Sequence, residues 1–276
     1  MIANHIKNIL KTSLFAGGIN FIALYIFMIN ADKKDFGIYL ILSALFVLPS
    51  RLTEVINETI IRFGHQNKKD ENQFTLLLFS SAIILYLALS VIIIFIICFV
   101  SVFLKYGEEY SAYLIFTLFL MGFLNVIKNF LLSLHSSKLK FDFILKINFV
   151  GSIIFFSFII LIVNKFNSEV IYFLWLNIII SFFQIYFLKD FKINNFKFFN
   201  KKKFIYYYKK YFKKYSLPLF GNHIFSFFSK EHFSNLILGI SFGPEILTNI
   251  ALLRGVYDFI HNFIGKFLKK LQSIYH

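Results

Sequence analysis

Cysteine is nearly absent from the chain, which has a single one, Cys98, among its 276 residues. A disulfide framework and a thiolate metal site are therefore excluded. The seven histidines are scattered, and no two have the HExxH spacing of a zinc protease. The sequence also has no glycine-rich phosphate loop and no Ser/His/Asp arrangement. We therefore expect no metal, no cofactor and no catalytic residue, and we predict that the protein is not an enzyme.

Charge is scarce as well, and negative charge most of all. Only 16% of the residues are charged, with 29 lysines and arginines against 14 aspartates and glutamates, which gives a formal net charge of +15. Hydrophobic residues make up 58% of the chain. Ordinary soluble domains are about a quarter charged, and they lack repeated apolar runs of roughly 20 residues. The composition therefore predicts a polytopic membrane protein.

Eight apolar segments predict an all-α fold with eight transmembrane helices. The first six would form one six-helix bundle, and the last two would be the first helix pair of a second bundle. The predicted spans are Ser13–Asn30, Phe36–Arg62, Phe74–Leu104, Ala112–Leu134, Phe143–Asn164, Val170–Leu188, Leu217–Ile240 and Ile246–Leu268. The corresponding domains are residues 1–188, a basic cytoplasmic linker at 189–216, and residues 217–276.

The lysines and arginines lie mainly in alternate connections between the spans. If the N-terminus is cytoplasmic, only Lys33, Lys34, Lys105 and Lys165 fall in outer loops. The positive-inside rule therefore favours cytoplasmic N- and C-termini. In the segment Lys189–Tyr215, lysines alternate with Phe and Tyr, which is typical of a helix in the headgroup layer that binds anionic lipid. The orientation of the chain in the membrane and contact with anionic lipid explain the excess of positive charge. We therefore do not expect nucleic acid as a partner.

The second predicted span carries a stripe of charge in its second half. Arg51, Glu54, Glu58 and Arg62 are 3, 4 and 4 residues apart, which places them within an arc of roughly 80° on a helix. A charge at membrane depth costs several kcal/mol unless it faces protein or water. The stripe is therefore predicted to line a cavity or a helix interface. The alternative is that Glu58 and Arg62 lie at the cytoplasmic surface and pair with each other.

The first and the last pair of predicted spans resemble each other. In each pair, a span that contains Gly and Asn ends in a short connection to Phe-Gly, at Phe36-Gly37 and at Phe242-Gly243, where the next helix begins. Both copies start on the same side of the membrane, so the pattern predicts a parallel internal repeat. The aligned segments are Ser13–Asn20 with Ser216–His223, and Asp35–Phe46 with Ser241–Leu252.

Short motifs, together with the repeat, carry a resemblance to a known family. The motifs are Lys7–Asn20, Asp35–Tyr39, Glu58–Gly64 and Ser216–Pro218. With them the chain resembles the bacterial oligosaccharide flippases, the O-antigen and polysaccharide transporters of the multidrug/oligosaccharidyl-lipid/polysaccharide exporter superfamily. Members usually have two bundles of six spans, so the resemblance implies that this chain is truncated in its second bundle. It also implies a place in the bacterial cytoplasmic (inner) membrane.

The function that the resemblance implies is the flipping of a lipid-linked oligosaccharide to the outer leaflet, without covalent chemistry, for surface polysaccharide such as the O-antigen of lipopolysaccharide. The anchor would be undecaprenyl phosphate or pyrophosphate, which cations would hold, and arginine suits phosphate through its fork of donors. In the repeat alignment Arg254 falls opposite Leu48, one turn from Arg51, so the two arginines are expected to face each other. The expected substrate-binding residues are Arg51, Arg254, Lys128, Asn125, Asn129, Asn222 and Lys230.

Acidic residues near these cations have two interpretations. Glu54, Asp258 and Glu231 could couple movement to a proton or sodium ion, or they could simply neutralise Arg51, Arg254 and Lys230 in turn. Two further polar residues, Asn20 and Asn148, are more simply explained as hydrogen-bond partners between helices than as ligands of the substrate.

Two rival functions stay open. An integral-membrane polysaccharide polymerase or glycosyltransferase could act on the same lipid, but such enzymes usually need a sizeable outer loop or catalytic carboxylates near the surface. The predicted outer loops have only about 5–7 residues. The other rival is a non-transporting remnant that cannot form a closed two-bundle cavity.

Overall fold

The computed structural model describes residues 2–64, 71–104, 112–166, 168–188, 205–206, 208–229 and 231–257. Within these ranges the chain is almost entirely helical and has no strand, which confirms the predicted all-α fold. Residues 244–257 form a helix that we call the 244–257 helix. The preceding elements are α1 (Ile2–Asn30), α2 (Lys33–Phe63), α3 (Glu71–Leu104), α4 (Ala112–Ser137), α5 (Phe141–Lys165), α6 (Val170–Leu188), the π-helical segment η2 (Tyr208–Ser216), α8 (Leu217–Ser229) and α9 (Glu231–Phe242).

Helical structure occurs, at least in part, at every predicted span. The helices α2, α4, α5 and α6 and the Phe74–Cys98 part of α3 are long and apolar enough to cross a membrane. The protein is therefore a multi-pass membrane protein. The bounds of α6 are those predicted, whereas α1 begins at Ile2 instead of Ser13. The predicted span Leu217–Ile240 is covered by α8 and α9, which lie on either side of Lys230, a residue outside the described ranges.

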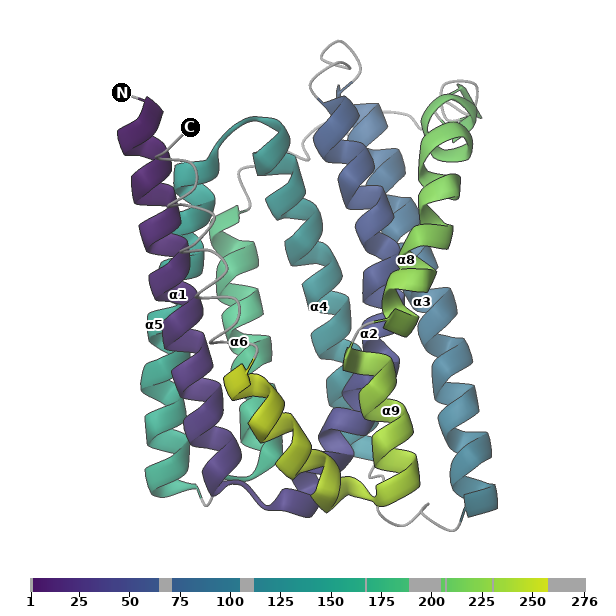
Figure 1. The fold of residues 1–276 in the computed structure, drawn as a ribbon. Coiled ribbons are helices and arrows are strands. Elements are labelled where there is room, and N and C mark those ends of the chain that lie inside the picture. Colours follow the sequence, from purple (N-terminus) through teal and green to yellow (C-terminus); the bar gives the residue numbers. More distant parts are fainter. Residues whose placement is uncertain are drawn as a thin grey trace.

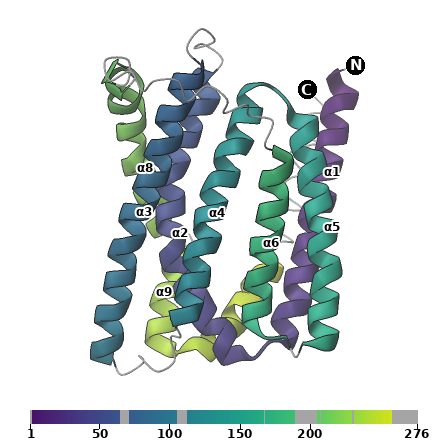
Figure 2. The same ribbon diagram turned by 180° about the vertical axis from the view of Figure 1, so that it is seen from behind.

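The helices run alternately up and down and form two groups joined by α4. Figures 1 and 2 show α1, α5 and α6 on one side and α2, α3 and α8 on the other, and α4 packs against both α2 and α6. The ends of α2, α4 and α6 lie at the same end of the bundle as the start of α1. We call this the upper end, after its position in Figure 1. The alternation agrees with the predicted order of crossings.

The turn between α1 and α2 is fixed by Asp32. Its side chain accepts hydrogen bonds from the backbone N–H groups of Lys34 (2.9 Å) and Asp35 (3.0 Å). Two donors that the start of a helix leaves unpaired are thereby satisfied. As a result, α2 begins at Lys33, before the predicted Phe36.

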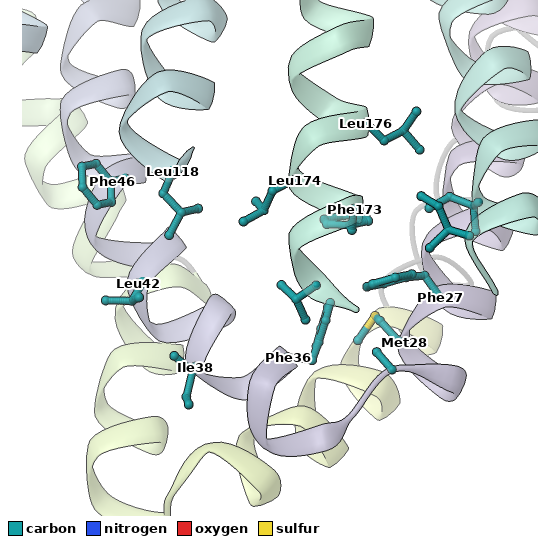
Figure 3. Close-up of a cluster of buried hydrophobic side chains, with 14 of the residues drawn as sticks. Phe27, Met28, Phe36, Ile38, Leu42, Phe46, Leu118, Phe173, Leu174 and Leu176 are labelled. Carbon is teal, nitrogen blue, oxygen red and sulfur yellow. The ribbon is translucent and has the colours of Figure 1, made fainter. Parts of the chain in front are cut away.

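Aromatic side chains close the lower end of the bundle. Phe27 of α1 stacks on Phe173 of α6 with 4.7 Å between the ring centroids, and the ring of Phe36 of α2 lies 6.0 Å from that of Phe27. Figure 3 shows these rings together with Leu118 of α4 and Leu174 of α6. All of these side chains are buried. We call this group the lower core; its side chains pack closely between α1, α2, α4 and α6.

The segment η2 is anchored to the upper end of the bundle by one aromatic residue. Tyr211 is buried, and its ring centroid lies 4.9 Å from that of Phe63 in α2 and 5.1 Å from that of Phe74 in α3. The lysines of η2 are exposed. The predicted headgroup helix at Lys189–Tyr215 thus has one described part that packs on the bundle, while its residues 189–204 lie outside the described residues.

The two predicted repeats pack reciprocally. The second helix of the first repeat, α2, packs against α8 and α9 of the second repeat. The second helix of the second repeat, the 244–257 helix, lies against α1, with Gly255 next to Phe21. The two second helices cross so closely that a Cβ on Gly37 would overlap the backbone of Pro244. At this crossing, the Thr248 hydroxyl donates a hydrogen bond of 2.7 Å to the carbonyl oxygen of Lys33.

Candidate functional site

A polar cavity of about 590 Å³ lies between α1, α4, α5 and α6. Five of its fifteen lining residues are amides, a high share for a cavity between apolar helices. The polar residues that line it are Asn20, Lys128, Asn129, Asn148, Ser152, Asn177 and Gln184. We call this space the polar cavity. Its residues come from the middle of α1, the second half of α4, the first half of α5 and most of α6, so it extends from the middle of the bundle toward the upper end (Figure 1).

Lys128 gives the polar cavity a positive charge. Among the described residues that line the cavity it is the only charged one, and none of the described residues pairs with its ammonium group. An ammonium that is partly removed from water and has no carboxylate partner is costly, so it favours an anion or water beside it. The polar cavity is therefore suited to an anionic ligand.

The amides of the polar cavity differ in how their hydrogen-bonding groups are used. The amide nitrogen of Asn177 donates to the carbonyl oxygen of Phe173 (2.8 Å), within its own helix. Gln184 of α6 donates to the side-chain oxygen of Asn148 of α5, at 3.4 Å. Asn148 thus forms the interhelical hydrogen bond expected of it, and it also lines the cavity with Asn20. Amides carry both donors and acceptors, which is what sugar hydroxyl groups require of a binding site.

Aromatic rings form the floor of the polar cavity. Phe155 and Phe173 both line it, and their rings meet edge to face with 6.0 Å between the centroids. Phe173 also belongs to the lower core. A ligand in the polar cavity would therefore be separated from the lower end of the bundle by the lower core.

A second polar region joins α2 to α8. Arg51 donates to both carboxylate oxygens of Glu54, each at 3.0 Å. From α8, His223 places Nε2 3.2 Å from Oε1 of Glu58 and Nδ1 4.0 Å from Oε2 of Glu54. We call these four residues the α2–α8 contact. The first three members of the charge stripe thus lie at a helix interface, which is one of the two predicted locations.

Arg62, the last member of the stripe, does not join the α2–α8 contact. Its guanidinium carbon lies 4.7 Å from the ring centroid of Tyr215 and 5.6 Å from that of Phe63. Glu58 pairs with His223 instead, so the alternative of a Glu58–Arg62 pair is wrong for the described residues.

Arg254 occupies a third place, on the 244–257 helix. Its guanidinium donates to the hydroxyl of Ser234 and to the side-chain oxygen of Asn235, both at 2.9 Å on α9. It also lines a cavity of about 160 Å³ beside α1 and α2. Among the described contacts, Arg51 and Arg254 share no partner. Both expected phosphate-binding arginines therefore use Nη1 to bind protein side chains, whereas no described residue pairs with Lys128.

The remaining predicted residues are dispersed or lie outside the description. Asn129 lines the polar cavity with Lys128, and Asn125 accepts a hydrogen bond from Ser181 of α6 at 3.5 Å. Asn222 is exposed on α8. Lys230 and Asp258 lie outside the described residues, as does the side chain of Glu231. The structure therefore brings two of the predicted substrate-binding residues, Lys128 and Asn129, together in one cavity.

Residues that sequence reasoning missed are Asn177, Gln184 and His223. Asn177 and Gln184 are seven residues apart in α6, with Ser181 between them, so they lie on one helical face. This spacing of polar residues along one face could have indicated a cavity lining. The rest of the span is apolar, which makes the pattern weak. For His223 there was no comparable pattern, because its partners lie on a distant helix.

No family model, no curated protein and no solved structure matches this chain. Its function has to follow from the chemistry of the polar cavity and of the α2–α8 contact.

Proposed function

We propose that the protein flips a lipid-linked oligosaccharide across a bacterial cytoplasmic membrane, and that the polar cavity holds the polar head of this lipid. The observation that carries the proposal is Lys128, a cation with no carboxylate beside it in a cavity lined by amides. The ammonium would bind the phosphate or pyrophosphate, and the amides would bind sugar hydroxyl groups. The undecaprenyl anchor follows from the family resemblance alone.

The division of the bundle into a polar and an apolar half supports a directional path. The polar cavity extends toward the upper end, while the lower core with Phe27, Phe36 and Phe173 separates it from the lower end. This arrangement supports a transporter that would receive its cargo from one side. Release to the other side would require these aromatic rings to separate.

The distribution of lysines supports a cytoplasmic upper end. At this end lie Lys138, Lys140 and the exposed lysines of η2, and the connection that follows α6 begins with further lysines. The lower end has Lys33, Lys34 and Lys165. Under the positive-inside rule the head group would enter the polar cavity from the cytoplasmic leaflet. Anionic lipid would contact the lysines of η2.

The test is a flipping assay with the full chain reconstituted in vesicles that contain a fluorescent lipid-linked oligosaccharide. The measured quantity is the fraction of oligosaccharide that becomes accessible to a lectin outside the vesicles. Lys128→Ala should lower the rate about tenfold or more, the amount expected when one charge-assisted contact is lost. Lys128→Arg should keep most of the activity, because it keeps the charge.

Lys165→Ala is the matched control, because Lys165 is an exposed lysine at the lower end of α5, away from the polar cavity. It should flip lipid at the native rate. The proposal fails if vesicles with the native protein flip no faster than empty vesicles, or if Lys128→Ala flips as fast as the native protein.

A further inference from the structure

His223 connects the two halves of the repeat through two carboxylates. It lies on α8, which belongs to the second repeat, and both of its ring nitrogens point toward glutamates of α2, which belongs to the first. The shorter contact is the 3.2 Å between Nε2 and Glu58. The imidazole is largely enclosed, with 16% of the side chain exposed. This residue was assigned no role from the sequence.

The charges of the α2–α8 contact balance only when the imidazole is protonated. Arg51 makes two hydrogen bonds to Glu54 and so neutralises one carboxylate. Among the described residues, Glu58 has no basic partner other than His223. With a neutral imidazole the contact has a net charge of −1, and with a protonated one it is neutral. Protonation also turns both ring nitrogens into donors, which allows one contact to each glutamate.

The other charged groups on the neighbouring helices do not compensate Glu58. On α2, Arg62 lies over the ring of Tyr215. On η2, the lysines at 209, 210, 213 and 214 are exposed, and Lys210 binds the hydroxyl of Tyr206 at 3.0 Å. The described side chains of α9, residues 233–242, are uncharged.

We infer that His223 is a proton-binding site that fastens α8 to α2 when it is protonated and loosens this contact when it is neutral. An imidazole changes its charge between roughly pH 5 and 8, a range in which ordinary carboxylates stay mostly ionised. Proton binding would thus bias the relative position of the two repeats. A role for this site in coupling proton binding to transport rests on the proposed function. The existence of the proton site can be tested without any transport assay.

The experiment measures the distance between α2 and α8 as a function of pH. Spin labels are attached at Ile61→Cys and Phe225→Cys, two exposed positions on α2 and α8, in the full chain with Cys98→Ser. Double electron–electron resonance at pH 8 and pH 5 then gives the populations of close and separated helices. We expect the ratio of close to separated forms to rise about tenfold on acidification, as for a charge-assisted hydrogen bond.

His223→Gln and Glu58→Gln should each abolish this pH response, because each removes one member of the 3.2 Å pair. Glu54→Gln should weaken it less, because its distance to the ring is 4.0 Å. His135→Gln is the matched control: His135 is a buried histidine whose Nε2 lies 3.0 Å from the carbonyl oxygen of Leu188, and its replacement should leave the response intact. An unchanged distance in the native protein, or a response that persists in His223→Gln, would overturn the proton site.

Flipping rates at pH 5 and pH 8 separate this inference from the proposed function. If the native protein flips no lipid at either pH, the proposed function fails, and the spin-label distances still decide the proton site. If it flips lipid equally well at both pH values and His223→Gln matches it, the coupling role fails while the proposed function stands. A pH dependence that His223→Gln removes supports both.

Discussion

The polar cavity and the α2–α8 contact each contain a basic side chain in an apolar chain, but they use it differently. In the α2–α8 contact Arg51 is neutralised by Glu54, and His223 faces two carboxylates. In the polar cavity Lys128 faces amides and no carboxylate. A paired cation is already neutralised by its partner, whereas an unpaired cation can still bind an anionic ligand. Under the proposed function the polar cavity would bind the cargo, and the α2–α8 contact would contribute stability and the pH dependence inferred for His223.

The largest effect should come from filling the polar cavity. A Cβ on Gly151 would lie 2.8 Å from the side-chain nitrogen of Gln184, and Gly151→Leu would extend further into the space. Flipping should fall about a hundredfold, because a bound head group would be displaced from its contacts. Gly221→Leu on α8 is the control, since nothing lies within 4 Å of a Cβ there. Equal flipping rates in the two variants would remove the cavity from the path.

A smaller loss should follow from Gln184→Leu, which keeps the size of the side chain but removes its hydrogen-bonding groups. The bond to Asn148 and one amide of the cavity would be lost together. We expect a loss of about tenfold in the flipping rate, measured with the same vesicles. Tyr186→Leu, at an exposed position on the same helix, should have no such effect. If both variants behave alike, the amides do not bind cargo.

The interface between α2 and η2, beside the α2–α8 contact, should respond in stability instead. The Thr59 and Ser216 hydroxyls are fully buried and form a hydrogen bond of 2.7 Å. Thr59→Val should lower the free energy of unfolding in detergent by about 1 kcal/mol, because Ser216 keeps a buried hydroxyl that has lost this partner. Adding Ser216→Ala should restore part of the loss. This bond involves no ionisable group, so the effect should be the same at pH 5 and pH 8.

The smallest effect should come from the Arg51–Glu54 pair. The two side chains are 33% and 32% exposed, so solvent screens their interaction. A double-mutant cycle with Arg51→Ala and Glu54→Ala should give a coupling free energy of about 0.5 kcal/mol. Arg51→Ala should also change the flipping rate by less than about twofold, since Arg51 does not line the polar cavity. A loss as large as that of Lys128→Ala would return Arg51 to the cargo path.

The sequence predicts the helices better than their ends. The apolar run of α6 is bounded by Glu169 and Lys189, so its bounds are those predicted. Hydropathy predicts a start of the first span at Ser13, because it reports the part of a helix that suits lipid. The helix itself extends back to Ile2, past Lys7 and Lys11.

The relative positions of site residues could be predicted where the residues lie on the same helix. Lys128 and Asn129 are neighbours on α4, and the structure keeps them in one cavity. Whether Arg51 and Arg254 face each other depends on the rotation and crossing of four helices, which an alignment of two repeats does not determine. The pairing of Glu58 with His223 instead of Arg62 likewise depends on where α8 packs.

The crossing of α2 with the 244–257 helix has a consequence for biogenesis. The first turn of α2 is completed by Thr248, which binds the carbonyl oxygen of Lys33, and by the backbone of Pro244 against Gly37. A nascent chain whose first six helices have already left the translocon still lacks these neighbours. The earliest-made helix pair must therefore wait, incompletely packed in lipid, until the ribosome has added residues more than 200 positions downstream.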